Sequence, residues 1–118
     1  MILADTSVWI DHLRATDPLL SGHLLDGRVA CHPFVIGELA VGSLRRRAEV
    51  LELLAALSTA PVVGHDEVLT FIDDHGLAGA GLGWIDVHLL ASARLAGHRL
   101  WTKDRRLARA THRIGVAP

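Results

Sequence analysis

Short apolar runs alternate with longer amphipathic segments along the whole chain. The runs have the length of buried strands and fall at residues 1–5, 28–32, 60–63, 99–102 and 115–118. The segments between them have helical spacing and fall at 6–14, 17–27, 33–42, 45–57, 66–78, 83–97 and 104–113. Helix signals support these boundaries, since Thr6 or Ser7 is a natural N-cap, Pro33 suits a first turn and Gly27 suits a helix end. This alternation predicts an α/β protein, a three-layer α/β/α sandwich around a mostly parallel sheet.

Composition agrees with a sheet that is covered on both faces. Hydrophobic residues make up 50% of the 118 residues, and the predicted strands read as continuous apolar runs. The length fits one domain over residues 1–118. Cys31 is the only cysteine, which excludes an internal disulfide and argues against a cysteine-based zinc site. No apolar stretch approaches the ~18 residues of a membrane span, and residues 1–5 lack the basic start of a signal peptide. We therefore expect a cytoplasmic protein with no membrane contact.

The formal net charge of −1 conceals an uneven distribution. From Arg94 onward there are seven Lys or Arg residues and one acid, Asp104, whereas the preceding part has five basic residues and twelve acids. A basic C-terminal segment is suited to a polyanionic partner. It is equally well explained as a solvated helix face, and charge alone does not decide between the two.

Two acids fall on apolar helix stripes. Asp86 lies one turn before two leucines of the 83–97 segment, and Glu38 shares a helix face with Phe34 and Val35. A bare carboxylate on a buried stripe costs roughly several kcal/mol unless something pairs with it. No Arg or Lys lies one turn away on either segment. The partner must come from elsewhere, either an arginine in a structural ion pair or a metal ion.

Two further acids lie where strands are predicted to end. Asp5 closes the first strand, and Asp104 follows the strand at 99–102 by two residues. Sites in parallel sheets lie outside these carboxyl ends, although each acid alone is also explained as an N-cap. Four convergent carboxylates would repel one another, and Mg²⁺ or Mn²⁺ would neutralise them, activate water and stabilise charge on a phosphoryl group. The pattern predicts a metal-dependent phosphodiesterase.

Three stretches, "ADTSVWIDHLR", "IGELAVG" and "GWIDVHLLASARLAGHRLWTKDRRLARAT", resemble PIN-domain ribonucleases of the VapC type, the toxins of toxin–antitoxin pairs. The resemblance extends over essentially the whole chain. It implies a Mg²⁺- or Mn²⁺-dependent endoribonuclease that cleaves structured RNA such as tRNA or rRNA. The implied catalytic and metal-binding acids are Asp5, Glu38, Asp86 and Asp104.

The same resemblance implies supporting residues and partners. Thr6 and Thr102 match hydroxyl positions that support the acids, whereas Arg106 stands where many members carry a further acid. A small antitoxin is implied, one that covers the acids with an Arg or Lys. The apolar excess of the chain suggests surface for burial both in that partner and in a toxin homodimer. We expect the antitoxin groove on the first helices, around Trp9, Leu13 and Leu44. We expect RNA contacts from the arginines that adjoin Asp104, namely Arg105, Arg106 and Arg109.

Other patterns are weaker. "GAGLG" at 79–83 follows a helix rather than a strand, so we interpret it as a flexible loop rather than a phosphate cradle. The eight histidines form no metal-binding pair on one helix face, and the three tryptophans are better explained as core or interface residues than as base-stacking platforms. Two alternative functions stay open: a catalytically silent RNA- or protein-binding module, and another Mg²⁺-dependent phosphohydrolase. Ser7 occupies the position where a phosphatase would need its second acid.

Overall fold

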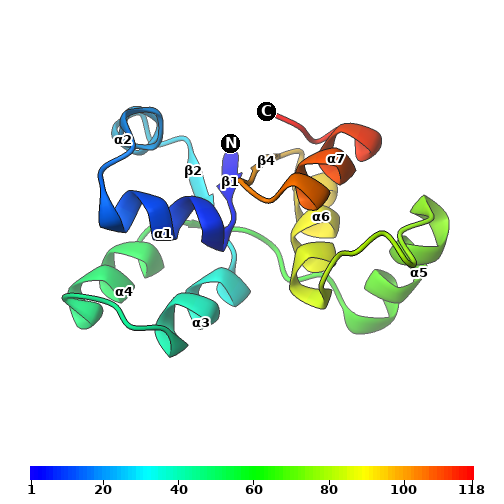
Figure 1. The fold of residues 1–118 in the computed structure, drawn as a ribbon, viewed down its shortest axis with the longest axis horizontal. Coiled ribbons are helices and arrows are strands. Elements are labelled where there is room, and N and C mark those ends of the chain that lie inside the picture. The colour runs from blue at the N-terminus through cyan, green and yellow to red at the C-terminus, as the bar shows by residue number, and fades with distance from the viewer.

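The computed structural model describes residues 1–118 and places a parallel four-stranded sheet between two groups of helices (Figure 1). Helices α1 to α4 lie on one side of the strands and α5 to α7 on the other. The strands are β1 (Ile2–Ala4), β2 (Val29–Cys31), β3 (Ser58–Thr59) and β4 (Arg99–Trp101). The helices are α1 (Thr6–Arg14), α2 (Pro18–Leu25), α3 (Pro33–Val41), α4 (Arg47–Ala55), α5 (His65–His75), α6 (Trp84–Ala96) and α7 (Arg105–Ile114). The predicted α/β fold is confirmed.

The order of the strands fixes where a site can form. The sheet runs β3-β2-β1-β4, with every neighbouring pair parallel. The chain therefore builds outward from β1 through β2 to β3 and then returns to pair β4 with the free side of β1, with Ala4 opposite Trp101. The strand order reverses between β1 and β4, and the carboxyl edge at such a switch point is where open α/β sheets bind ligands.

Helix α6 is the central helix of the core. It packs against β4, α5 and α7, and its residues from Val87 to Ala93 are all buried. In contrast, α7 buries one stripe of Leu107, Ala110 and Ile114, whose i, i+3, i+7 spacing matches a single apolar face. A helix that is buried on several sides tolerates few polar groups. Asp86, in the first turn of α6, therefore lies beside closely packed residues that fix its surroundings.

Two predicted strands differ in the structure. The strand expected at 60–63 is replaced by β3 at Ser58–Thr59, immediately before it. Pro61 has no backbone N–H and cannot continue the ladder, so pairing ends once Ala60 has donated to the carbonyl of Cys31. The segment 115–118 forms no strand either, although the N–H of Leu100 donates to the carbonyl of Val116. No helix combines the length and apolar character needed to cross a membrane.

Candidate active site

Asp5 and Asp104 lie at the carboxyl ends of β1 and β4, on either side of the switch point. Each caps the helix that follows: an oxygen of Asp5 accepts hydrogen bonds from the N–H groups of Ser7 and Val8, and an oxygen of Asp104 accepts one from Leu107. The two segments are joined directly, because the N–H of Asp5 donates to the carbonyl of Trp101 at 3.0 Å. The N-cap interpretation therefore holds for both acids, and it places both at one edge of the sheet. The expectation that Thr6 or Ser7 is the N-cap is wrong, because Asp5 takes that role and Thr6 is the first residue of the helix.

Hydroxyl groups fix the buried carboxylate of Asp5. Thr102 donates to its second oxygen at 2.6 Å and accepts the N–H of Asp104 at 3.0 Å. Ser7 donates to the first oxygen at 2.5 Å and accepts the N–H of Lys103 at 3.0 Å. The predicted supporting position of Thr102 thus contacts an acid. Ser7 was not predicted as a site residue, and its signal was local, since a hydroxyl two positions after an N-cap aspartate can reach the same carboxylate.

Glu38 reaches the same region from α3 but is not buried. The helix buries Val35 and Leu39, one turn apart, and leaves Glu38 exposed and Val41 89% exposed. The expectation that Glu38 lies on a buried stripe is therefore wrong, because the buried stripe of this helix runs beside it. Thr6, the first residue of α1, donates its hydroxyl to Glu38 Oε1 at 2.7 Å. This contact ties the acid to the helix that Asp5 caps.

The carboxyl of Asp86 is affected both by burial and by neighbouring charges. It lies half-buried in the first turn of α6 and accepts the N–H of Gly83 at 2.9 Å. Burial raises the pKa of this carboxyl, and the negative charges of Asp104, Asp5 and Glu38 raise it further. Because all three other acids act on Asp86, the four carboxylates share one electrostatic neighbourhood.

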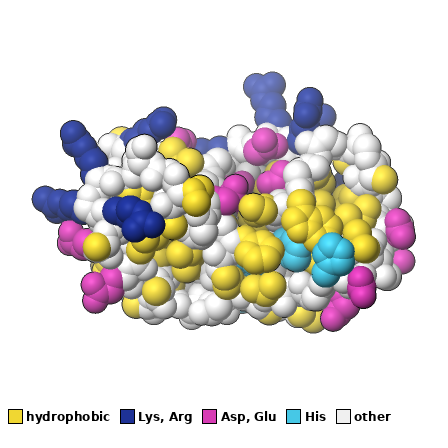
Figure 2. All heavy atoms as spheres, turned by 90° about the horizontal axis from the view of Figure 1, so that it is seen from below, with side chains coloured by type: hydrophobic (Ala, Val, Ile, Leu, Met, Phe, Trp, Pro, Cys, Tyr) yellow, Lys and Arg dark blue, Asp and Glu magenta, His cyan; other side chains and the backbone are white.

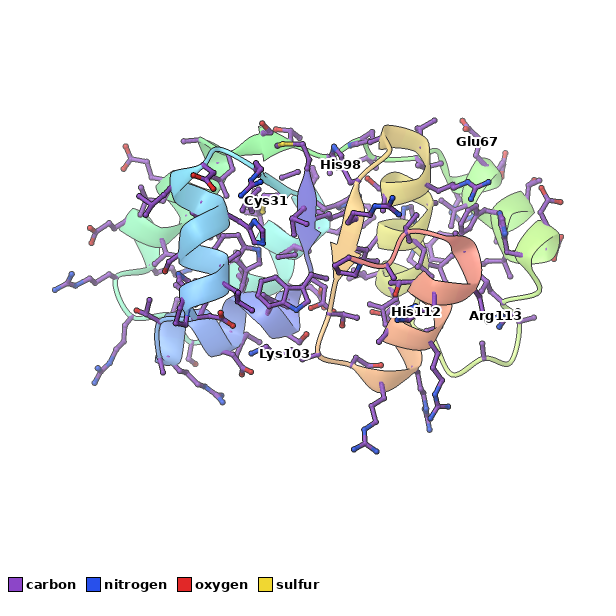
Figure 3. All side chains as sticks on the ribbon, turned by 90° about the horizontal axis from the view of Figure 1, so that it is seen from above. Cys31, Glu67, His98, Lys103, His112 and Arg113 are labelled. Carbon is purple, nitrogen blue, oxygen red and sulfur yellow. The ribbon has the colours of Figure 1, made fainter.

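No basic side chain pairs with any of these four acids. The ion pairs of the protein join Arg28 to Asp26, and Lys103 to Asp11 and Asp17. Lys103 stands next to Asp104 in the sequence, yet its ammonium group lies 3.0 Å from Asp11 and points toward α1 and α2 (Figure 3). The structural ion pair considered for Asp86 and Glu38 is therefore wrong, and their charge is left for another cation.

The donor set suits a hard divalent cation. Asp86 Oδ1, Asp104 Oδ2 and Glu38 Oε2 accept no hydrogen bond from the protein, so each acid offers a free carboxylate oxygen. No three His, Cys, Asp or Glu side chains are arranged to hold one ion directly, so the four acids are neighbours without being a preassembled shell. Mg²⁺ needs no such shell, since it usually keeps several waters and binds through one or two carboxylates.

Three arginines in the first half of α7, the helix that Asp104 caps, have no partner in the protein. The other arginines of the basic segment are engaged with backbone carbonyls: Arg94 with Ile114, Arg99 with Gly115 and Arg113 with His75. Arg105, Arg106 and Arg109 form no hydrogen bond or ion pair. In Figure 2, basic side chains project from the upper edge of the molecule, and acidic side chains lie below them. A free cationic group adjoining an acidic site is suited to phosphate.

A series of packed aromatic and imidazole rings, of which His32 and His88 are buried, links α3 to α6. His88 packs edge-on against Phe34 of α3, with ring centroids 4.8 Å apart, and against Trp84 of α6 at 4.7 Å. Phe34 in turn packs against His32 at 5.0 Å, and burial, followed by the neighbouring His88, lowers the pKa of His32 to about 4. These imidazoles are neutral at physiological pH. They connect the helix that carries Glu38 to the helix that carries Asp86.

Comparison with known proteins identifies the class. The PIN-domain family model matches residues 2–113, and the chain belongs to the PIN-domain family. It is 54% identical over 118 residues to Ribonuclease VapC32 of Mycobacterium tuberculosis strain CDC 1551 / Oshkosh, an alignment that covers 99% of this chain and 95% of the relative. The protein of the same name from strain ATCC 25618 / H37Rv shows the same identity. These matches confirm the prediction of a VapC-type ribonuclease over the two alternatives.

A solved structure supports the fold. PAE2754 from Pyrobaculum aerophilum superimposes with a TM-score of 0.62, over 92% of this chain and 78% of that protein, at 19% sequence identity. At this identity the likeness concerns the fold alone. PIN-domain ribonucleases generally depend on a divalent metal, in agreement with the all-oxygen donor set.

Proposed function

We propose that this protein is an endoribonuclease toxin whose acid quartet, Asp5, Glu38, Asp86 and Asp104, is the catalytic centre, with Mg²⁺ or Mn²⁺ as its cofactor. One observation carries the assignment. The pKa of Asp86 is raised by its burial and by the charges of the three other acids, while no Lys or Arg pairs with any of them. An uncompensated cluster of this kind is costly to folding and is retained for a function.

Each residue has a definite task in this proposal. Asp86, Asp104 and Glu38 offer free oxygens to the ion, and Asp5 is held rigid by the hydroxyls of Thr102 and Ser7. Thr6 orients Glu38. When bound, the divalent ion supplies an activated water and stabilises negative charge on the phosphoryl group. The protein contributes the fixed placement of the carboxylates, which makes the reaction effectively intramolecular.

Structured RNA such as tRNA or rRNA is the substrate class that we propose. Its phosphates would be held by the free arginines of α7, Arg105, Arg106 and Arg109. Incubation of the purified protein with total cellular RNA, in Mg²⁺, Mn²⁺ or EDTA, tests both parts. Discrete fragments that require the metal are expected, and their ends identify the target. Intact RNA under every metal condition would contradict the proposal.

We further propose a small antitoxin partner and a toxin homodimer. Trp9 cannot line the antitoxin groove as expected, because it is 3% exposed and belongs to the core. The outer face of α1, the helix that Asp5 caps, instead presents Ile10 and Leu13, which are 37% and 40% exposed and one turn apart. An antitoxin that packs on this face could place an arginine on the carboxylates with bidentate geometry.

Co-expression with candidate antitoxins tests the proposed partner, and light scattering of the purified toxin tests the proposed dimer. Co-purification and loss of ribonuclease activity are expected, and Leu13→Glu should weaken the complex without affecting cleavage by the free toxin. Full activity of the complex would contradict the idea that the partner covers the site.

A further inference from the structure

The side chain of Arg106 lies directly against the bare backbone of Gly81. A Cβ atom placed on Gly81 would lie 2.8 Å from Arg106 Cδ, 3.0 Å from Nη1 and 3.1 Å from Nε. Gly81 also has φ +78°, in the left-handed region that favours glycine. The Arg106 side chain therefore occupies the space beside Gly81, and any other residue at position 81 would force it to shift.

This contact joins the two segments that bring acids to the site. Arg106 is in the first turn of α7, two residues after Asp104, and Gly81 is in the loop that leads into α6, five residues before Asp86. The Arg106 side chain is exposed and its guanidinium forms no hydrogen bond or ion pair, so its donors are free to bind a ligand. Its contact with Gly81 places it between the loop that leads to Asp86 and the helix that Asp104 caps.

The charge of the site explains the use of such a group. Four ionised carboxylates and one divalent ion leave two negative charges uncompensated, and these repel an approaching phosphodiester. A planar guanidinium can bind two phosphate oxygens at once, which fixes orientation as well as position.

We propose that Arg106, which packs on Gly81, binds and orients the scissile phosphate of the RNA, and that Gly81 is a positioning residue because its missing side chain leaves room for the guanidinium. The inference rests on the proposed ribonuclease function. It goes beyond general RNA attraction, because it separates Arg106 from the neighbouring arginines of α7. Those side chains add charge, whereas Arg106 also contacts the loop that leads to Asp86.

Glycine substitutions provide a matched test. Gly81→Ala would displace the guanidinium without removing its charge. Gly79→Ala is the control, since Gly79 has a similar φ of +74° but no atom within 4 Å of its added Cβ. Alanine is strained at both positions because φ is positive at each, and thermal unfolding verifies that both variants are folded. Arg106→Ala and the double variant Gly81→Ala/Arg106→Ala complete a double-mutant cycle.

Two readouts separate orientation from attraction. Single-turnover cleavage at saturating RNA reports orientation, and RNA binding in EDTA, followed by fluorescence anisotropy over a range of salt, reports attraction. Arg106→Ala should slow cleavage on the order of 100-fold and reduce the salt slope of binding by about one. Gly81→Ala should slow cleavage comparably with an unchanged salt slope, Gly79→Ala should cleave like the wild type, and the double variant should be no slower than Arg106→Ala.

Several outcomes would overturn the inference. Equal rates for Gly81→Ala and Gly79→Ala, or strictly additive losses in the double variant, would show that the contact has no part in cleavage. If Gly81→Ala does not fold, Arg106→Lys takes its place: it should keep the salt slope and lose most of the cleavage rate, and wild-type cleavage by this variant would refute the orienting role. A wild-type protein that cleaves no RNA would overturn the proposed function as well, so the two failures are distinguishable.

Discussion

Asp86→Asn separates the chemical role of the acid quartet from its cost to folding. The substitution keeps the size of the side chain and an oxygen that can accept the N–H of Gly83, and it removes one negative charge. Loss of a conserved outer partner of a metal site typically costs about 10–100-fold. Loss of a carboxylate that binds the ion directly should therefore slow RNA cleavage by more than about 100-fold, or about 2.7 kcal/mol in transition-state free energy.

In contrast to its effect on activity, Asp86→Asn should raise the free energy of unfolding or leave it almost unchanged. The folded state disfavours the charged form of Asp86, as its raised pKa indicates, so the wild type loses stability as the pH rises through that pKa. Asparagine avoids this loss but gives up the favourable interaction of a charge with the helix N-terminus, about 0.3–1 kcal/mol. We expect the free energy of unfolding of the metal-free variant to lie within about 1 kcal/mol of the wild-type value at neutral pH. The difference should shift in favour of the variant as the pH rises through the pKa of Asp86.

Glu67→Gln is the matched control. Glu67 occupies the third position of α5 after a glycine N-cap, as Asp86 does in α6, and lies at the far edge of the molecule from Lys103 (Figure 3). It should lose the same helix-terminal interaction and retain full cleavage. Cleavage of a labelled RNA in Mg²⁺ and Mn²⁺, with urea unfolding in EDTA, measures both effects. Wild-type cleavage by Asp86→Asn, or equal losses in the two variants, would refute the assignment.

Three further predictions concern other parts of the molecule. RNA affinity should fall steeply with salt, and alanine at the three free arginines of α7 should reduce the salt slope more than alanine at 45–47; equal slopes in both sets would contradict the placement of the RNA. Thr102→Val removes a hydrogen bond to Asp5 and should slow cleavage by about 10–100-fold. Thr70→Val, at an exposed position of α5, is the control and should have no effect. A normal cleavage rate in Thr102→Val would show that Asp5 does not need the threonine hydroxyl. The lowered pKa of His32, about 4, predicts that stability is full above pH 6.5 and falls by up to about 3 kcal/mol as the pH approaches 4. His32→Asn should flatten this part of the urea-unfolding profile, and an unchanged slope would be evidence against a neutral buried imidazole.

Much of the fold follows from local patterns. Helical spacing and N-cap residues place α1, α3, α6 and α7 within a residue or two of their ends, because these signals act over one or two turns. Strand pairing is less local. The sequence suggested a strand at 60–63, and the position of β3 depends on how Pro61 limits pairing with β2.

The site residues likewise divide into those that local sequence signals predict and those that depend on tertiary packing. Asp5, Asp86 and Asp104 could be proposed from their places at predicted strand and helix ends. The exposure of Glu38 could not, since an apolar neighbour on the same helix does not specify which stripe faces the core. The contact between Gly81 and Arg106 joins residues 25 positions apart and depends on the packing of α6 against α7, which no short window of sequence contains.

The capping role of the acids has a consequence for how the chain can change over generations. Asp5, Asp86 and Asp104 each accept a backbone N–H at the start of a helix, whereas Glu38 accepts only a threonine hydroxyl. On the proposed function, alanine in place of either N-cap aspartate, Asp5 or Asp104, should remove activity and about 1 kcal/mol of stability together. Replacement of Glu38 should remove activity while the fold keeps its caps. Selection against a harmful nuclease should therefore act first at Glu38, so that silenced descendants keep their three aspartates and remain able to bind a partner.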